Sequence, residues 1–459
     1  MKITPVALAC ALIFGVTGNA LAADSTEVEL LKQQMAALQQ QMANLQGKLS
    51  AMSAQQQTAP VATSSSSSPL STKIAGADVT LYGHADLSAE ATDNGKERTN
   101  QVSSNLSYVG VRGGKDLGNT GLRAVFQVET LANISGTPTE TGGLASRNSF
   151  VGLHGGFGTI MLGKTDTPYK QATAAMDPFS ASVGDYNSIM GNTGGDLRAE
   201  FDARLPHSIF YYSPTFSGFS ARLLYSPGQK LHNLAGASNN AFPQGEKVCA
   251  GATPGSSGST PDGNSCDDGA FQNAYSLSLD YAAGPLTGTL AYERHSAVDR
   301  TGDTGGIVSD ESAAKAGLSY RFGGNRVSGI VEKLYRDGGI NPALNERART
   351  GYYLSDVQDL GHATDLMLAW AHAGQTPGGP DFGTADDKAN MYSLGLKYHY
   401  DKQTSLYLVG AMLKQGAGAH YALGAGGHGV AIASPRDESG ATIPGQTEKA
   451  LSVGMQYNF

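Results

Sequence analysis

The chain ends with the sequence LSVGMQYNF, residues 451–459, in which apolar and polar side chains alternate without a break. Leu451, Val453, Met455, Tyr457 and Phe459 share one face of an extended chain, because successive side chains of a strand point to opposite faces. The apolar face continues to the terminal Phe459, with no polar tail behind it. A soluble protein rarely exposes such a face, whereas a strand between lipid and water requires it. The stretch therefore predicts a membrane-spanning strand that ends at the seam of a barrel.

The same alternation recurs along the chain from residue 78 onwards. In the first segment, Val79, Leu81 and Leu87 share one face, while Asp86 and Ser88 lie on the other. Sixteen segments of this kind are predicted, and bacterial outer-membrane barrels have even numbers of strands. They lie near 78–91, 102–114, 121–133, 146–154, 158–164, 206–214, 219–227, 272–282, 286–296, 312–322, 326–336, 347–357, 362–373, 389–400, 403–414 and 447–459.

The connections between these segments alternate in length. Short turns such as 155–157 and 323–325 alternate with long loops, of which 165–205, 228–271 and 415–446 are the longest. A soluble sandwich has no reason to collect its long loops at one end. Outer-membrane barrels do so, with short periplasmic turns and long external loops. The predicted fold class is all-β, a 16-stranded antiparallel transmembrane β-barrel.

Composition excludes several other classes of protein. Gly accounts for 60 of the 459 residues, which argues against a helical protein because each Gly inside a helix costs about 1 kcal/mol relative to Ala. The formal net charge of -8 offers no basic footprint for nucleic acid. After the N-terminus, no apolar run reaches the ~18 residues of a transmembrane helix. No nucleophile elbow, phosphate loop or dinucleotide fingerprint is present, so we expect no enzyme activity.

The N-terminal region divides into three parts. Residues 1–22 have the features of a secretory signal peptide: Lys2, an apolar stretch from Val6 to Val16, and small residues before a cut after Ala22. Residues 23–54 are predicted to form a coiled-coil stalk. Residues 55–77 are rich in Ser, Gln and Pro and are predicted to be a linker. The barrel is assigned to residues 78–459.

The coiled-coil prediction depends on an unbroken heptad pattern. Apolar residues are spaced alternately three and four apart, as the a and d positions of a coiled coil require. Placed before the first strand, this segment is expected in the periplasm, with three helices emerging together from a trimer. Its core positions are Val28, Leu31, Met35, Leu38, Met42, Leu45, Leu49 and Met52.

Two further features fall in the loop 228–271. Cys249 and Cys266 remain after the signal peptide is removed, and a lone pair of cysteines in an exported chain predicts a disulfide. No cofactor or metal site is predicted elsewhere. The segment 262–268 offers Asp and Asn oxygens of the kind that Ca²⁺ accepts, and a solvated acidic loop is the alternative interpretation.

Short motifs recur along the predicted strands and their turns. They are DVTLYG at 78–83, GVRG at 110–113, DLG at 116–118, AVFQVE at 124–129, RNSFVGL at 147–153, GFGT at 156–159, SI at 208–209 and YSP at 212–214. As a set, these motifs resemble those of the Gram-negative general porin family, in its Neisseria- and Bordetella-type branch. The resemblance covers residues 78–459 and implies a homotrimer of barrels whose third long loop folds inward. It also implies that Met455, Tyr457 and Phe459 are the signal for the barrel-assembly machinery.

Porins of this family have an acidic inward loop that faces basic residues on the wall. The resemblance therefore implies an acidic constriction by residues of the loop 165–205 and a basic wall opposite it. Tyr108 stands where family members commonly have Arg, so we expect weak or cation-leaning selectivity. The candidate acids are Asp185, Asp196, Glu200 and Asp202, and the candidate basic residues are Arg112, Arg123, Arg147 and Arg204.

These patterns predict an outer-membrane porin of a Gram-negative bacterium, with its N-terminal segment in the periplasm. Passive diffusion of small hydrophilic solutes and ions through trimers is the leading hypothesis, because charges in a water-filled lumen act as a filter. One alternative is a channel specific for a sugar or an anion. Another is a structural tether that binds peptidoglycan through the coiled coil. Outer-membrane lipid and lipopolysaccharide are the expected surroundings.

Overall fold

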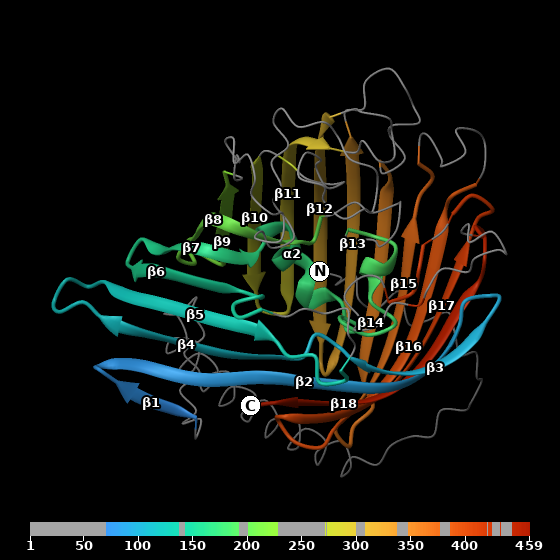
Figure 1. Ribbon diagram of the computed structural model, residues 1–459, viewed down its shortest axis with the longest axis horizontal. Helices are drawn as coiled ribbons and strands as arrows, with labels where there is room; N and C mark the ends of the chain where they lie inside the picture. The colour runs from blue at the N-terminus through green and yellow to red at the C-terminus, as the bar shows by residue number, and fades with distance from the viewer. Residues whose placement is uncertain are drawn as a thin grey trace, which may run out of the picture. The chain divides into compact units, whose positions relative to one another are not determined.

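The computed structural model describes residues 70–136, 143–191, 201–227, 271, 273–299, 308–336, 348–376, 386–419, 421–424, 432 and 443–459. The predicted signal peptide, the coiled coil and most of the linker lie outside the described residues. So do Cys249, Cys266 and the segment 262–268. The described part of the chain forms the barrel (Figure 1).

The elements are almost all strands. Among the described residues, no helix is long and apolar enough to cross a membrane. The strands are β1 (Ser71–Ile74), β2 (Ala77–Asp93), β3 (Arg98–Ser104), β4 (Tyr108–Asp116), β5 (Arg123–Leu131), β6 (Ser149–Gly155), β7 (Gly158–Asp166), β8 (Arg204–Tyr212), β9 (Phe219–Ser226), β10 (Asn273–Ala283), β11 (Leu286–Asp299), β12 (Val308–Phe322), β13 (Asn325–Arg336), β14 (Thr350–Asp359), β15 (Thr364–Ala373), β16 (Ala389–His399), β17 (Thr404–Gln415) and β18 (Glu448–Asn458). Three short helical segments lie between β7 and β8: α2 (Pro168–Thr173), η2 (Ala174–Met176) and η3 (Tyr186–Ser188).

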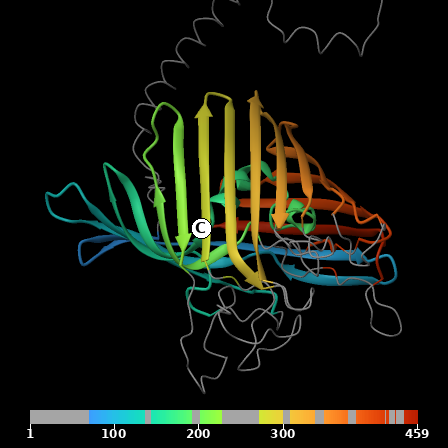
Figure 2. The same cartoon turned by 90° about the horizontal axis from the view of Figure 1, so that it is seen from above.

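The strands close into a barrel of 16 antiparallel strands, which confirms the predicted fold class. Closure comes from the pairing of β18 with β2. Strands β3 and β4 both pair with β2 and together make a single strand of the wall. The interruption lies at Asn105–Ser107, where Leu106 has a φ of 53° and the Asn105 side chain turns into the barrel. Figure 2 shows strands of the wall from β8 to β13 standing side by side.

The seam is built from the two ends of the barrel sequence. Gly83 and Phe459 exchange two backbone hydrogen bonds of 3.1 Å. The Phe459 ring lies over Gly83, where an added Cβ would approach it to 2.3 Å, so a larger residue at this position would displace the ring. Beyond Phe459, β1 continues along the same edge of β2, from Leu70 opposite Leu81 to Ile74 opposite Ala77.

Strand β1 lies within the range that the sequence analysis assigned to the linker. It reaches β2 through a two-residue turn at Ala75 and Gly76, whose φ values are 52° and 80°. Positive φ at both positions is typical of the tight turn that matches the twist of a hairpin. The first described strand therefore begins a few residues before the predicted start of the barrel.

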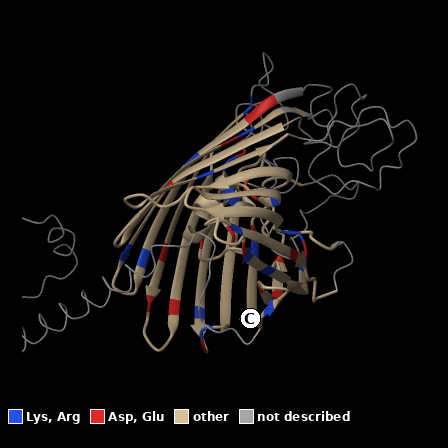
Figure 3. Cartoon of the chain, turned by 90° about the vertical axis from the view of Figure 1, so that its left-hand side faces the viewer, with Lys and Arg blue, Asp and Glu red and all other residues tan. Residues whose placement is uncertain are grey.

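The two faces of the wall have opposite chemistry. Large apolar side chains point outward and are exposed, for example Val151, Leu394 and Val453 at 62%, 55% and 57%. Between them, small and polar residues point inward, and along most of the wall the ribbon carries no charged residue (Figure 3). An apolar outer band around a polar interior is the pattern of a barrel that crosses a membrane.

Outward-facing aromatic residues form a girdle at each end of the longer strands. Such girdles mark the two membrane–water interfaces of outer-membrane barrels. Within them, the rings of Tyr225 and Tyr275 lie 4.9 Å apart and those of Phe219 and Tyr281 lie 4.6 Å apart. The long-loop girdle comprises Tyr225, Tyr275, Tyr292, Tyr335, Tyr352, Trp370 and Tyr392, and the short-turn girdle comprises Phe219, Tyr281, Tyr320, Phe322, Tyr398 and Tyr457.

Candidate functional site: the channel lumen

The described parts of the loop between β7 and β8, residues 167–191 and 201–203, fold into the barrel. Its first turn is the helix α2, where the Thr167 hydroxyl accepts a hydrogen bond from the Lys170 N–H and Pro168 occupies the first turn. A hydroxyl at the N-cap and Pro in the first turn are favourable for helix initiation. Helix α2 contacts β9, β10, β11 and β12 from inside (Figure 1). The expected inward loop is therefore present in the structure.

Two wall residues hold both ends of this inward loop. Lys315 on β12 and Glu332 on β13 face each other across neighbouring strands. At the start of the loop, the Tyr169 hydroxyl donates to Glu332 over 2.7 Å and the Tyr169 ring lies 3.9 Å from the Lys315 ammonium. Farther along, the Gly191 N–H donates to the second Glu332 oxygen over 2.9 Å. At the end of the loop, Lys315 pairs with Asp202.

The middle of the loop packs against the wall through buried apolar side chains. Its buried apolar residues meet inward side chains of β13 to β17, and the Tyr186 ring lies 4.9 Å from that of Tyr353. Three inward glycines of the wall make room: a Cβ at Gly317 would approach Met176 to 2.7 Å, and one at Gly395 would approach Phe179 to 3.0 Å. The loop residues are Met176, Phe179, Val183, Tyr186, Ile189 and Met190, and the third glycine is Gly351.

Two carboxylates are buried in the same interface. Asp177 accepts hydrogen bonds from the Tyr353 hydroxyl over 2.6 Å and from the Phe179 N–H over 2.9 Å. Asp185 accepts from the N–H groups of Ala181 and Asn187 and caps η3. Burial raises the pKa of Asp177 to about 6, and burial together with the nearby Asp177 charge raises the pKa of Asp185.

The structure places two of the four predicted constriction acids. Asp185 is 3% exposed and Asp202 is 2% exposed, so both carboxylates hold the loop in place. Asp196 and Glu200 lie outside the described residues. A direct role of these four residues at the constriction stays a prediction.

The wall formed by β2 to β6 carries a basic and aromatic cluster. The Arg112 guanidinium lies 4.6 Å from the centre of the Tyr82 ring, and that of Arg147 lies 4.7 Å from the Tyr108 ring. Glu129 accepts from Arg147 over 2.6 Å and from the Tyr82 hydroxyl over 3.0 Å. The tyrosine at position 108 thus supports an arginine by a cation–π contact.

The other two predicted basic residues lie apart from this cluster. Arg204, at the start of β8, pairs with Asp166 over 3.0 Å and donates to Asn148 over 2.7 Å. Arg123 lies at the short-turn end of β5, where it pairs with Asp78 over 2.8 Å and Asp116 over 2.9 Å. The structure brings Arg112 and Arg147 together, and it places Arg123 at the turn.

Several lumen residues were missed by the sequence analysis. Arg222 on β9 pairs with Asp280 on β10 over 2.8 Å and also donates to Gln171 of α2. Lys170 on α2 pairs with Asp166 over 3.1 Å. The alternation in 219–226 already places Arg222 on the polar face, so the signal for this residue was present. No local pattern marks Lys170, because its position depends on where the loop docks.

No metal centre is evident in the part of the chain that the structure describes. His, Cys, Asp and Glu residues do not gather there in groups of three or more. The candidate Ca²⁺ segment 262–268 and the predicted disulfide lie outside the described residues, so both stay predictions.

A closed barrel with an apolar outer band, a charged interior and an inward loop defines an outer-membrane channel protein. The model of the Gram-negative porin family matches residues 50–417, and the chain belongs to this family. It is an outer-membrane porin, a channel protein and not an enzyme.

The relatives agree with the branch that the motifs indicated. Outer membrane porin protein 32 of Delftia acidovorans is 26% identical over 84% of this chain and 95% of its own length. The major outer membrane protein P.IA of Neisseria meningitidis serogroup C is 28% identical over 69% of this chain and 79% of its own. In structure, the anion-selective porin from Comamonas acidovorans matches with a TM-score of 0.62 at 23% identity, covering 83% of this chain and 100% of that one.

Proposed function

We propose that this porin forms trimers whose water-filled channels pass small hydrophilic solutes and ions by passive diffusion, with a weak preference for anions. The observation that carries this proposal is the inward loop, held at both ends by Lys315 and Glu332. With that loop against β10 to β17, the open passage runs along the wall of β2 to β9.

The charges along that passage support a weak selectivity. Five cations and five carboxylates of the described residues lie on its inner face, so the two signs nearly balance, and charges in a narrow lumen act as a filter. The sequence-based expectation of weak or cation-leaning selectivity did not include Lys170 and Arg222. A relative in fold is described as an anion-selective porin, which agrees with the direction. The cations are Arg112, Arg147, Lys170, Arg204 and Arg222, and the acids are Asp86, Glu90, Glu129, Asp166 and Asp280.

The trimer is supported by the outer face of β2 to β7. On these strands, Phe126 is the single outward-facing aromatic residue among those described, and Val, Leu, Ile, Ala and Gly fill the other apolar positions. The remaining strands carry both aromatic girdles. Because girdles form where a barrel meets lipid headgroups, a face without them fits a contact between copies of this chain.

The reversal potential of purified protein in a planar bilayer tests the solute proposal. Under a KCl gradient, we expect a modest potential with the sign of chloride preference, and linear conductance without block by sugars. A potential with the sign of potassium preference would overturn the preference for anions. Saturable block by one sugar or one anion would favour the alternative of a solute-specific channel.

The N-terminal stalk and its partners belong to the same proposal. Strand β1 approaches β2 at its short-turn end, which supports a periplasmic position for the preceding segment 23–54 after removal of residues 1–22. Deleting residues 24–69 retains β1 and should leave conducting trimers, as native electrophoresis and bilayer recording would report. Retention of the 24–60 peptide on purified peptidoglycan would support the tether, and failure to bind would contradict it.

Assembly and cross-linking can be tested on the same protein. We propose that Phe459 and Tyr457 bind the barrel-assembly machinery, so Phe459→Ala should reduce the amount of folded protein in the outer membrane. We also propose a disulfide between Cys249 and Cys266, which a mass shift after reduction and alkylation of the mature protein would reveal. Two free thiols before reduction would contradict it.

A further inference from the structure

His84 lies in the middle of the 17-residue strand β2 and faces the passage. It shares its inward direction with Tyr82 and Asp86. The outward residues Leu81 and Leu87 of the same strand are exposed. The His84 side chain is 18% exposed. Because the passage runs along this wall, the imidazole is in contact with the water through which solutes move.

The basic and aromatic cluster of the wall adjoins His84. Tyr108 is directly opposite His84 on β4, and the centres of the two rings are 5.7 Å apart. The Arg147 guanidinium lies 4.7 Å from the centre of the same Tyr108 ring. A positive charge on His84 is therefore added beside the arginines of this wall.

The hydrogen bonds of His84 define which ring nitrogen can take up a proton. Its Nδ1 is 2.8 Å from the side-chain oxygen of Asn458, which lies opposite His84 on β18. The amide nitrogen of Asn458 lies 3.5 Å from the Gln403 carbonyl oxygen, which agrees with this orientation of the amide. Because an amide oxygen only accepts, Nδ1 carries the hydrogen and Nε2 is the basic nitrogen.

The basic nitrogen lies close to a buried carboxylate. Nε2 of His84 is 3.9 Å from Asp86, which is 2% exposed. Asp86 accepts from the Tyr407 hydroxyl and from the Gln456 amide, each over 2.7 Å, and both donors are neutral. Lys397 on β16 donates to Gln456 over 2.6 Å. A proton on Nε2 thus gives Asp86 a cationic neighbour on its own strand.

Several charged and titratable groups of the described residues surround His84, and they carry both signs. They are Asp86 and Tyr82 on β2, Tyr108 on β4, Tyr407 on β17 and Lys397 on β16, with Arg147 on the Tyr108 ring and Glu129 at the Tyr82 hydroxyl.

The other inward-facing histidines of the described residues are placed differently. His154 and His399 lie at the short-turn ends of β6 and β16. His295 faces inward from β11 but is only 1% exposed. Among these histidines, His84 is therefore the one in the middle of the passage wall.

The charges of the passage make it sensitive to one added proton. Five cations and five carboxylates of the described residues lie on its inner face, so the two signs nearly balance while His84 is neutral. Histidine is the side chain whose charge ordinarily changes between pH 5 and pH 8. The charge of this one side chain then sets the excess.

We propose that His84 is a specificity-determining residue of this porin, which ties its ion selectivity to pH. When Nε2 binds a proton, the passage gains preference for small anions, and when the proton leaves, that gain is lost. This inference rests on the proposed function, because it concerns the selectivity of an open, water-filled passage.

Reversal potentials of the purified full-length protein in a KCl gradient, recorded at pH 8 and at pH 5, test the role of His84. In the wild type, the ratio of chloride to potassium permeability should be at least about twofold higher at pH 5. Twofold is the share expected of one unit charge about 10 Å from the ion path in water. His84→Gln can still donate to Asn458 but cannot take up a proton, so it should lose this twofold share.

His84→Lys tests the same charge in the opposite direction. Its ammonium is positive at both pH values, so the permeability ratio at pH 8 should rise about twofold above the wild-type ratio. Burial raises the pKa of Asp177 in the inward loop to about 6. The shift that such carboxylates cause should be the same in the wild type and in both His84 variants.

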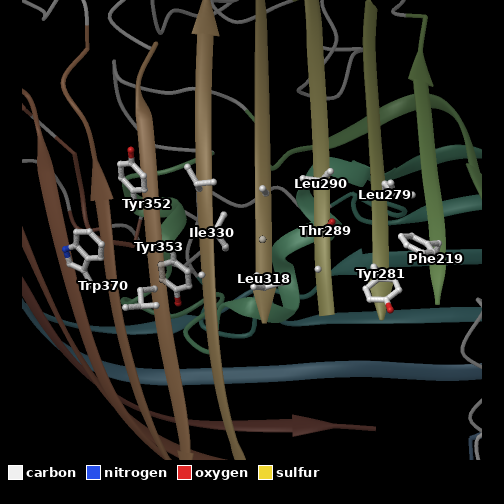
Figure 4. Close-up of a pocket in the computed structure, with 16 residues that line it drawn as sticks. Phe219, Leu279, Tyr281, Thr289, Leu290, Leu318, Ile330, Tyr352, Tyr353 and Trp370 are labelled. Carbon is white, nitrogen blue, oxygen red and sulfur yellow. The ribbon is translucent and has the colours of Figure 1, made fainter. Parts of the chain in front are cut away.

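His372→Gln is the matched control on the outer wall. Nδ1 of His372 is 3.0 Å from the side-chain oxygen of Asn390, a contact of the same kind as that between His84 and Asn458. The His372 ring lies 5.9 Å from that of Trp370. Figure 4 shows Trp370 and Tyr352 on neighbouring strands. This variant should keep the full wild-type shift.

The possible outcomes separate this inference from the proposed function. Chloride preference with the same pH shift in the wild type and in H84Q would agree with the proposed function and would overturn the role of His84. A wild-type ratio at pH 8 in H84K, or an equal loss of the shift in H372Q, would also overturn it. Potassium preference at pH 8 that moves toward chloride at pH 5 only when His84 is present would contradict the proposed preference for anions and support the role of His84.

Discussion

The two halves of the lumen wall obey the same alternation of side chains but have opposite character. On β13 to β17 the inward positions include Ile330, Met367, Met391 and Val409, and they bury the inward loop. On β2 to β6 the inward positions include Tyr82, Arg112 and Glu129, and they remain in contact with the passage. The comparison teaches that a porin wall can use its inner face either as a packing surface or as a charged lining. The side that packs the loop determines which side is left for solutes.

The largest expected effect comes from removing the buried ion pair between Lys315 and Asp202, which holds the end of the inward loop on the wall. Lys315→Met leaves Asp202 buried without its partner, and removing one member of a buried pair costs about 3–5 kcal/mol. The end of the loop should leave the wall, and single-channel conductance should rise with added current noise. The double variant K315M/D202N should recover part of the wild-type conductance, because no uncompensated charge is left. Wild-type conductance in K315M would show that the ion pair between Lys315 and Asp202 does not hold the loop.

The buried carboxylate of Asp177 should make docking of the loop depend on pH. Because its pKa is raised to about 6 in the docked loop, from about 4 in water, the docked state binds the proton more tightly than the free loop does. Docking is therefore strongest below pH 4 and weakens by about 2–3 kcal/mol as pH rises to 6 and beyond. The raised pKa of Asp185 acts in the same direction.

Open-channel noise between pH 4.5 and pH 7.5 measures this dependence. We expect more noise at pH 7.5 in the wild type and a smaller difference in Asp177→Asn, whose side chain has no proton to lose. Greater noise at pH 4.5 than at pH 7.5 would contradict the assignment.

The charged side should respond through selectivity and not through conductance. A unit charge about 10 Å from the ion path in water contributes about 0.4 kcal/mol, a factor of about two in permeability ratio. Arg112→Gln should therefore lower the ratio of anion to cation permeability by about that factor, and the reversal potential should move toward cation preference. Arg147→Gln should shift it further, because it also leaves Glu129 without its ion pair. Arg98→Gln, at an exposed position on the long-loop side, should leave the potential unchanged, and an equal shift there would refute a local effect.

The smallest expected effect concerns the Tyr82 hydroxyl on the charged half of the wall, β2 to β6. Tyr82→Phe keeps the ring under Arg112 and removes the hydroxyl that donates to Glu129. The loss of one such hydrogen bond should cost about 1 kcal/mol of stability and should not change selectivity. The midpoint of thermal unfolding checks this, with Tyr335→Phe on the outer face as the control. A selectivity shift in Y82F would mean that the hydroxyl itself contacts the permeating ions.

The strands could be predicted from the sequence almost completely. All sixteen predicted segments correspond to strands of the closed wall, because alternation is a local property that each strand carries by itself. The break at Asn105 was not predicted, since it depends on hydrogen bonds from the Asn105 side chain to Asp86 and Tyr407, which come from distant strands. Strand β1 was missed because a four-residue strand is too short to show a period.

The candidate site could be predicted only in part. Arg112 and Arg147 were placed on the inner wall through the family resemblance, and both lie in the cluster around Glu129. Arg123 was placed on the inner face by the alternation of its strand, but it lies at the turn, because alternation reports the face of a residue and not its height in the barrel. Lys170 was missed because its position depends on where the loop docks, and Asp280 was missed because its partner Arg222 belongs to another strand.

The sequence by itself determined the barrel, its number of strands, its apolar outer face and its membrane, because these follow from periodicity and composition. Only the tertiary structure decided where the inward loop lies and which wall lines the passage. Tyr169 reaches Glu332 across 163 positions of sequence, and Asp202 reaches Lys315 across 113. A local pattern can show which face of its strand a residue occupies. Docking of the inward loop depends instead on partners that are distant in sequence and that come close only when the barrel closes.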